Sequence, residues 1–458
     1  MPSAPSVTRS LFPLDEELEL LAGRFTPSVC EGMTRLGTWM PFKRAVKEMN
    51  YFWQVTVTEP TVRRTTEGAG GAYVAVQTAE VEQLERTLPR PPQGPAVQLM
   101  SVDGAYVPLV HKQWAEVKTL ALGTVGEPVV EDGEPVVHTT DLSYFSRLAE
   151  AEAFERLALV ETHRRGTETA HQVCAVTDGA EWEQGFIDSH REDAVRILDF
   201  SHAAEYVAAA GQAVLGEGTP PFQAWLTGTL HELKHGQPEK VLQTLRDMQA
   251  EVRERGSGSD AAAETIQKSL TYLEKRRDPM DYAHFQALGY PIGSGSVESA
   301  NKLVVEARLK GAGMHWARSQ VDPLVALRNV ACSDRWEEAW PQIARELRRQ
   351  AAQRRADQRQ KRKTRCDELP ALADATRVTE KTDSTPMTIE TPTTSTSAPT
   401  PSRRHPQPPR RRGVLPPIIP SDSTRLAKPA TNPRNRGSLQ NFDAHPLARG
   451  AFQFGGDL

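Results

Sequence analysis

Hydrophobic and polar positions follow two different patterns along this chain, and the changes between them divide it into parts. Residues 14–87 carry apolar positions at helical spacing. Residues 96–123 carry short apolar runs separated by Asp-Gly and other turn residues, which predict strands. Helical and strand patterns then alternate to about residue 210, and residues 211–286 are helical throughout. The pattern predicts a mixed α/β layer fold with an all-helical insertion.

Five segments have the composition of β-strands. They are Ala96–Val102, Ala105–Val110, Glu116–Gly123, Gln172–Thr177 and Ala194–Leu198. Short loops join the first three segments, which predicts an antiparallel meander. A helical stretch is predicted from about Leu142 to Arg164, before the fourth strand. The expected fold class is therefore α/β with a five-stranded mixed sheet.

The helical segment before the sheet contains two short helices with a tight join. Pro41 stands at the start of one helix, and Thr58 is placed to cap the next. The second helix carries Arg63 and Arg64, whose charges suit DNA phosphates. This arrangement predicts a helix-turn-helix. The alternative is an ordinary helical hairpin with a solvated basic face.

Composition sets the predicted boundaries between parts of the chain. The parts are an N-terminal tail (1–13), a helical domain (14–87), a linker (88–95), a sheet domain (96–343, with its insertion at about 211–286) and a tail (344–458). Four prolines stand among the eight residues of the linker, which excludes a helix or a central strand there. The tail is basic over 345–365, where a solvated helix is an alternative, and then rich in Thr, Pro and Ser. Such a composition cannot bury a core and predicts disorder.

Bulk composition excludes several classes of protein. The 458 residues carry a formal net charge of −4, which by itself indicates no polyanionic partner. The four cysteines are far apart and form no CxxC pair, so neither a zinc knuckle nor a disulfide framework is indicated. No apolar run has the length of a membrane span, and the first ten residues have no signal-peptide core. A cytoplasmic protein is expected.

A Gly/Pro/Ser-rich loop, residues 289–295, runs into a helix that carries Glu298 in its first turn. The predicted apolar stripe of this helix consists of Ala300, Leu303, Val304 and Ala307. Four polar residues lie off that stripe, namely Glu298, Asn301, Lys302 and Arg308. Glu298 is therefore expected at the mouth of the loop, with Lys302 and Arg308 as phosphate contacts. The alternative is a first-turn acid that forms an i, i+4 pair with Lys302.

Three acids stand at positions where a functional site is expected: Asp103, Asp178 and Glu298. The first two end strands and are followed by Gly, which lets a ligand approach the backbone. Gathered carboxylates repel one another unless a cation lies between them, and oxygen ligands suit Mg²⁺, or Mn²⁺ in its place. Two such ions, about 3.5–4 Å apart, activate an attacking oxygen and stabilise a leaving one, which is phosphodiester chemistry. No GxxxxGK[ST] loop is present, and the low aromatic content argues against a glycosidase.

Several long strings carry a specific resemblance to a known family. SVDGAYVPL, WAEVKTLALG, AVTDGAEWEQGFID, RILDFSHAAEYV and GYPIGSGSVESANKLVVEARLKGAGMHW resemble bacterial insertion-sequence transposases of the ISKra type. The resemblance spans roughly Leu11 to Trp340. It implies a DDE-class enzyme with an RNase H-like core, in which Asp103, Asp178 and Glu298 bind the metal ions. Family members often carry a Cys-rich N-terminal motif that this chain lacks, as a shorter variant or a truncated copy would.

The resemblance also implies roles for three further residues. Asp199 and His202 resemble an element of related transposases that positions the substrate or the metal site; a buried structural hydrogen bond is the alternative. Trp225, in the insertion, resembles a tryptophan that stacks on a flipped base, and a core position is the alternative.

The implied function is cleavage at insertion-sequence ends and strand transfer into target DNA. The expected partners are the terminal inverted repeats and the target DNA, with a homodimer or a larger assembly holding two ends in the bacterial cytoplasm, at the nucleoid. Two alternatives stay open: an inactive, repressor-like DNA-binding relative, and a structure-specific nuclease on the same fold.

Overall fold

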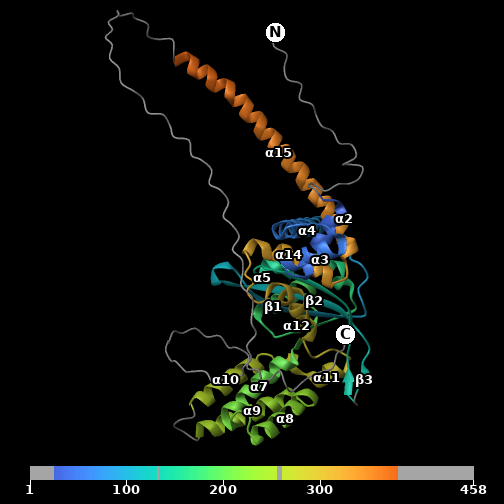
Figure 1. The fold of residues 1–458 in the computed structure, drawn as a ribbon. Helices are drawn as coiled ribbons and strands as arrows, with labels where there is room; N and C mark the ends of the chain where they lie inside the picture. The colour runs from blue at the N-terminus through green and yellow to red at the C-terminus, as the bar shows by residue number, and fades with distance from the viewer. Residues whose placement is uncertain (1–24, 132–133, 255–259, 380–458) are drawn as a thin grey trace, which may run out of the picture. The chain divides into compact units, whose positions relative to one another are not determined.

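A five-stranded mixed sheet is the framework on which the helices of the first 363 residues pack (Figure 1). The computed structural model describes residues 25–131, 134–254 and 260–379. Contacts divide the chain into two units, Met1–Lys363 and Thr364–Leu458. The mixed α/β class predicted from the sequence is confirmed.

The strand order of the sheet is β5-β2-β1-β6-β7. Its strands are β1 (Val97–Pro108), β2 (Trp114–Val125), β5 (Thr139–Arg147), β6 (Gln172–Thr177) and β7 (Val195–Leu198). β1, β2 and β5 pair antiparallel, whereas β6 runs parallel to both β1 and β7. A separate two-stranded hairpin consists of β3 (Val129–Glu131) and β4 (Glu134–Val136).

Two strand predictions were wrong. β1 continues through Asp103 and Gly104, where a turn was predicted, and Gly104 pairs with Lys118 on β2. A Cβ atom at position 104 would lie 2.4 Å from the carboxylate of Glu116, so glycine serves close packing here, not a turn. β5 lies in the segment predicted to be helical. All of residues 143–147 are buried, which removes the alternation on which a strand prediction depends.

The two faces of the central strands bury different clusters. Val102 and Leu120 pack under α5 (Ala151–Arg164) and α6 (Glu181–Arg191). Ala105 and Val117, on the opposite face, share a cluster with the helices that follow the Gly-rich loop. Those helices are α12 (Gly295–Ala300), the π-helical segment η4 (Asn301–Glu306), α13 (Ala307–Leu309) and α14 (Arg318–Cys332).

The N-terminal helices share this second cluster instead of forming a core of their own. They are α2 (Pro27–Trp39), α3 (Phe42–Trp53) and α4 (Glu59–Thr87). Met33, Phe42 and Val62 pack in one cluster with Ala105 and Val304. α4 is 29 residues long and packs along α14. The helix-turn-helix therefore remains a prediction, and the predicted domain 14–87 is not separate from the sheet domain in packing.

The predicted insertion is helical. It contains the end of α7 (Phe200–Leu215), then α8 (Pro220–His235), α9 (Pro238–Glu254), α10 (Asp260–Glu274) and α11 (Tyr282–Ala287). One cluster joins these helices to the sheet, because Leu99, Val176 and Ile197 pack with Leu245 and Leu270. Figure 1 shows α7–α10 grouped at one end of the sheet, and α2–α4 with α14 at the other. Single 3₁₀ turns lie at Val110–Lys112, Thr167–Thr169 and Asp278–Met280.

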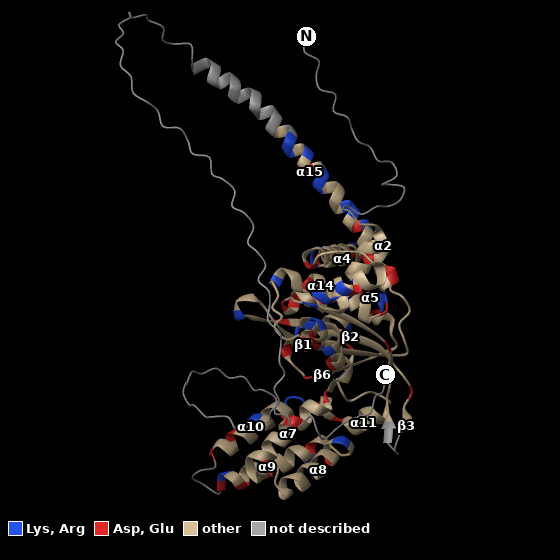
Figure 2. Ribbon diagram, viewed as in Figure 1, with Lys and Arg blue, Asp and Glu red and all other residues tan. Residues whose placement is uncertain are grey.

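The last described helix, α15 (Trp336–Thr379), crosses the boundary predicted at residue 344. The solvated helix offered as the alternative over 345–365 is therefore present and continues to Thr379, where disorder was predicted, and residues 380–458 lie outside the described part of the chain. Residues 352–362 are exposed, and basic bands run along this stretch (Figure 2). The backbone N–H and C=O groups of such a solvated helix form hydrogen bonds within the helix, so the helix does not need to pack against a core. Among the described residues, no helix combines the length and apolarity that crossing a membrane requires.

Candidate metal centre

Asp103 and Asp178 are brought together by the pairing of two neighbouring strands. Asp103 lies on β1, and Asp178 directly follows β6. The parallel register pairs Met100 with Ala175. Continuing that register by three residues on each strand brings Asp103 level with Asp178. The sequence prediction that these two carboxylates meet is therefore confirmed.

Glu183, on α6, supplies a third carboxylate that the sequence prediction missed. Oxygen atoms of Asp103, Asp178 and Glu183 all lie within 4.8 Å of one another. Glu183 is 1% exposed, and its Oε2 accepts hydrogen bonds from the backbone N–H groups of Gly179 at 3.0 Å and Ala180 at 3.1 Å. Glu at the third position of a helix is a capping-box position, and that spacing is the signal from which Glu183 was predictable.

The electrostatics of these carboxylates disfavour negative charge in the absence of a cation. The pKa of Asp103 is raised to about 6, chiefly by burial and also by the charges of Asp178 and Glu298, while the hydrogen bonds from Gly104 and Asn301 oppose the rise. Burial, followed by the hydrogen bond and charge of Asp178, raises the pKa of Glu183 to about 10. A divalent cation would reverse both effects, because it stabilises the ionised forms.

Glu298 lies beside this cluster and not within it. α12 packs against β1 and β2, and the charge of Glu298 is felt at Asp103. The Glu298 side chain is nevertheless 48% exposed, and its Oε2 lies 3.7 Å from Nζ of Lys302. The i, i+4 pair offered as the alternative from sequence is thus present. Of the three predicted acids, the structure brings two together and places the third nearby.

The predicted apolar stripe after Glu298 was wrong in part. Leu303 is 40% exposed and Ala307 is exposed, whereas the polar residues Asn301 and Arg308 are buried. The stripe failed because polar side chains with specific partners occupy the inner face, which a hydrophobic pattern cannot identify. The helix also widens into a π-turn over η4, a feature that often marks functional sites.

Asn301 touches the metal-centre candidate directly. Its Nδ2 donates a hydrogen bond of 2.8 Å to Oδ2 of Asp103. Its Oδ1 is buried and has no hydrogen-bond partner among the described residues. Oδ1 of Asp103 in turn accepts a 2.6 Å hydrogen bond from the backbone N–H of Gly104. Both oxygens of the Asp103 carboxylate are therefore oriented by neighbouring groups.

The prediction that Arg308 contacts phosphate was wrong, because the side chain is 1% exposed. Its Nε donates to the carbonyl oxygen of Gly37 at 3.0 Å, and its guanidinium lies over the rings of Phe42 and Trp316. Arg308 thus connects α13 to the N-terminal helices through this hydrogen bond and the contact with Phe42. Lys302 is exposed, and its expected role at phosphate stays a prediction.

Asp199 connects the end of β7 to the Gly-rich loop. Its Oδ2 accepts from the backbone N–H of His202 at 2.8 Å, and its Oδ1 accepts from that of Ser294 at 2.7 Å. Asp199 is 4% exposed, so the structural alternative describes its hydrogen bonds. Through Ser294, which immediately precedes α12, Asp199 also fixes where the Glu298 helix begins.

The helical insertion holds the loop that carries Asp178. The hydroxyl of Tyr272 donates to the carbonyl oxygen of Asp178, and Nη2 of Arg276 donates to that of Gly179 at 2.6 Å. The Arg276 guanidinium lies 3.8 Å from the centre of the Tyr272 ring. The ring of His202 meets that of Tyr272 edge-on at 5.6 Å, so His202 touches this support and not the carboxylates. Neither Tyr272 nor Arg276 was predicted from the sequence.

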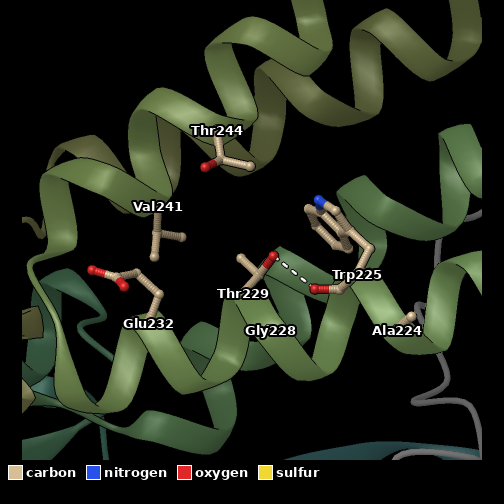
Figure 3. A pocket seen from close by; sticks show the side chains of 7 residues that line it. All are labelled: Ala224, Trp225, Gly228, Thr229, Glu232, Val241 and Thr244. Carbon is tan, nitrogen blue, oxygen red and sulfur yellow. Dashed lines mark hydrogen bonds between the residues drawn. The ribbon is translucent and has the colours of Figure 1, made fainter.

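Trp225 lies in the insertion, where it lines an open pocket of about 330 Å³ between α8 and α9 (Figure 3). Its ring packs so closely on Gly211 that a Cβ atom there would lie 2.2 Å away. The pocket shares no lining residue with the carboxylate cluster. Trp225 is partly buried and packs against the hydrophobic cluster of the insertion, and a base-stacking role stays a prediction.

Arg63 and Arg64, at the start of α4, are both exposed. The guanidinium of Arg63 lies 5.4 Å from the centre of the Phe42 ring. Both side chains are therefore accessible to DNA, and their contacts with DNA stay predictions.

Comparison with protein-family models gives no match for this chain. A comparison with curated proteins gives no match either. The function is therefore inferred from the site itself.

Proposed function

We propose that this protein is a DNA transposase, which cleaves DNA at insertion-sequence ends and transfers the strand to target DNA in a Mg²⁺-dependent reaction. The observation that carries the proposal is the meeting of Asp103 and Asp178 at the register of two parallel strands, with α12 and Glu298 packed beside them. The mixed sheet is compatible with the RNase H-like core that the sequence resemblance implies.

The donor set fits a hard divalent cation. Each candidate ligand offers oxygen, and the buried Oδ1 of Asn301, which has no hydrogen-bond partner within the described part of the chain, adds one more oxygen on the residue that binds Asp103. Oxygen ligands of this kind suit Mg²⁺ or Mn²⁺ and do not favour zinc. When bound, such ions supply an activated water or 3′-hydroxyl and stabilise the leaving oxygen.

The residues of this chain orient the ligands for that chemistry. Asn301 and Gly104 fix the two oxygens of Asp103. Glu183, with its two backbone hydrogen bonds, holds the turn that follows Asp178. We assign Glu298 as the third ligand, because its charge acts on Asp103 and its exposed side chain makes only a long 3.7 Å contact with Lys302 among the ion pairs of the described residues. Geometry held in advance reduces the reorganisation that the reaction requires.

Mg²⁺-dependent nicking of DNA that contains the element's ends tests the proposal. Wild type is expected to nick this DNA, and the Asp103→Ala and Glu298→Gln variants are each expected to nick it at least about 100-fold more slowly. Glu183→Gln keeps an acceptor for Gly179 and Ala180, so its rate should stay within about tenfold of wild type. Glu181→Gln removes an exposed carboxylate from the same helix and is the matched control.

Equal nicking by wild type and Asp103→Ala would refute the proposal. Loss of activity in Glu183→Gln but not in Glu298→Gln would replace Glu298 by Glu183 as the third ligand. A strand-transfer assay on the nicked product separates a transposase from a structure-specific nuclease, because only the transposase joins the freed 3′ end to a second DNA.

A further inference from the structure

α3 presents a basic face to solvent that the transposition chemistry does not use. Lys43, Arg44, Lys47, Asn50 and Tyr51 are all exposed. At about 100° per residue they occupy a single side of the helix. The opposite side, with Phe42, Ala45 and Met49, is buried against the rest of the fold. α3 therefore does not need its outer face for packing.

The C-terminal end of α3 carries three exposed aromatic side chains in succession. Tyr51 is 78% exposed, Phe52 68% and Trp53 49%. Their rings meet edge to face, at 5.0 Å between Tyr51 and Phe52 and 6.5 Å between Phe52 and Trp53. Trp53 also covers Gly32 of α2, whereas Tyr51 and Phe52 project furthest into solvent. Contiguous exposed aromatics of this kind mark a binding surface.

The charges beside these rings select the class of partner. Three cations line the face, and Glu48, the acid of this helix, is half-buried with a long contact of 3.7 Å to Arg44. Arg63 and Arg64 add positive charge from the start of α4, and Arg63 lies over the Phe42 ring at the base of α3. Cations that follow a phosphate backbone, next to aromatic rings on which bases stack, are the requirements for binding unpaired nucleic acid.

We propose that the outer face of α3, together with the exposed aromatic rings at its C-terminal end, binds DNA next to unpaired bases, with Lys43, Arg44 and Lys47 at phosphates and Tyr51 and Phe52 stacked on bases. The inference deepens the proposed function, since it takes DNA as the partner, and it assigns the contact to α3 instead of the second helix of the predicted helix-turn-helix. Unpaired bases occur where a strand has been cut and displaced, so DNA of this kind arises in the reaction that the proposed function describes.

Fluorescence anisotropy in EDTA measures this binding without cleavage. The probes are oligothymidylate, a duplex with an oligothymidylate flank, and the same duplex with blunt ends. Tyr51→Ala and Phe52→Ala should each weaken binding to the two probes with unpaired bases by at least about fivefold, and binding to the blunt duplex by less. Tyr106→Ala removes an exposed aromatic ring, 57% exposed, from the β1–β2 hairpin and should leave all three affinities unchanged.

The cations have a separate signature. The double variant Lys43→Gln, Lys47→Gln should bind all three probes more weakly. The slope of the logarithm of its binding constant against the logarithm of salt concentration should be smaller by about 0.7–0.9 per residue replaced. A control with the same change in net charge is Lys240→Gln, Lys268→Gln, whose side chains are 63% and 70% exposed on the insertion. This control should bind as wild type does.

The outcomes distinguish the two proposals. If wild type binds no probe, both this inference and the proposed function fail. If wild type binds but the α3 variants bind equally well, only the α3 assignment fails. If Tyr51→Ala and Phe52→Ala instead change the molar mass measured by light scattering and leave DNA affinity unchanged, the face covers another copy of the chain, and the inference is refuted. Asp103→Ala should abolish cleavage and leave binding intact.

Discussion

Gly70, on α4, lies in close contact with the backbone of α14, and replacing it with alanine should force the two helices apart. A Cβ atom at position 70 would lie 2.0 Å from the backbone oxygen of Pro323 on α14. Ordinary contact requires at least 3.4 Å, so the two helices would have to move apart by more than an ångström. Backbone atoms cannot rotate away as the end of a side chain can, so the clash has no inexpensive local relief.

The magnitude follows from two opposing effects. In an unobstructed helix, Gly→Ala stabilises by about 0.5–1 kcal/mol. At position 70, overpacking costs about 1–3 kcal/mol, and it also loosens the buried contacts of Ala69, Ala72 and Leu327 in the same interface. Because both variants share the gain in helix propensity, Gly70→Ala is expected to be about 1–3 kcal/mol less stable than an unobstructed Gly→Ala change nearby.

The neighbouring glycines supply that matched comparison. A Cβ atom at Gly68 or Gly71 would meet nothing within 4 Å, so both alanine variants should be as stable as wild type or more stable. Urea unfolding, followed by circular dichroism in EDTA, gives the free energy of unfolding of each variant. If Gly70→Ala were as stable as Gly71→Ala, the close packing of α4 on α14 would be wrong, and with it the shared core of the N-terminal helices.

Two further predictions concern buried charge. The pKa of Asp103 in the folded state is raised to about 6 from its usual 3.8, so between these pH values the metal-free folded state holds a proton that the unfolded state has lost. This group therefore makes the free energy of unfolding fall as pH rises through the window. Asp103→Asn should flatten that fall in urea unfolding at pH 4–7, and an unchanged slope would contradict the assignment. Burial lowers the pKa of Arg308 to about 10, and one of its nitrogens has no partner among the described residues. The free energy of unfolding of Arg308→Met should therefore lie within about 1 kcal/mol of wild type, and the salt dependence of its DNA binding should be the same. A weaker salt dependence would support the phosphate contact that was predicted from the sequence.

Local signals in the sequence predict most of the elements and two of the three site carboxylates. Asp103 and Asp178 were found because each ends or interrupts an apolar run beside a glycine, and the register of parallel strands then brings them together. The helical insertion was equally predictable, because its apolar positions recur at helical spacing over long stretches.

The errors arise where tertiary contacts override a local pattern. Gly104 resembles a turn residue but serves a close approach within a strand. The buried run at residues 143–147 has no alternation, since both its faces are covered. Asn301 and Arg308 occupy the inner face of their helix because Asp103 and Gly37 accept their hydrogen bonds, and those partners are distant in sequence. A pattern restricted to one window contains no information about such partners.

The same reasoning explains why the insertion belongs to the site although none of its carboxylates joins the cluster. Turns that end strands are free to move unless something holds them, and a metal centre needs its ligands held before the ion arrives. Here Tyr272 and Arg276 bind the backbone carbonyl groups of Asp178 and Gly179, while Glu183 binds the N–H groups of the same turn. The turn is thus held from both sides through its backbone, and the Asp178 carboxylate is oriented as well, because its Oδ1 accepts a 2.9 Å hydrogen bond from the N–H of Ala180.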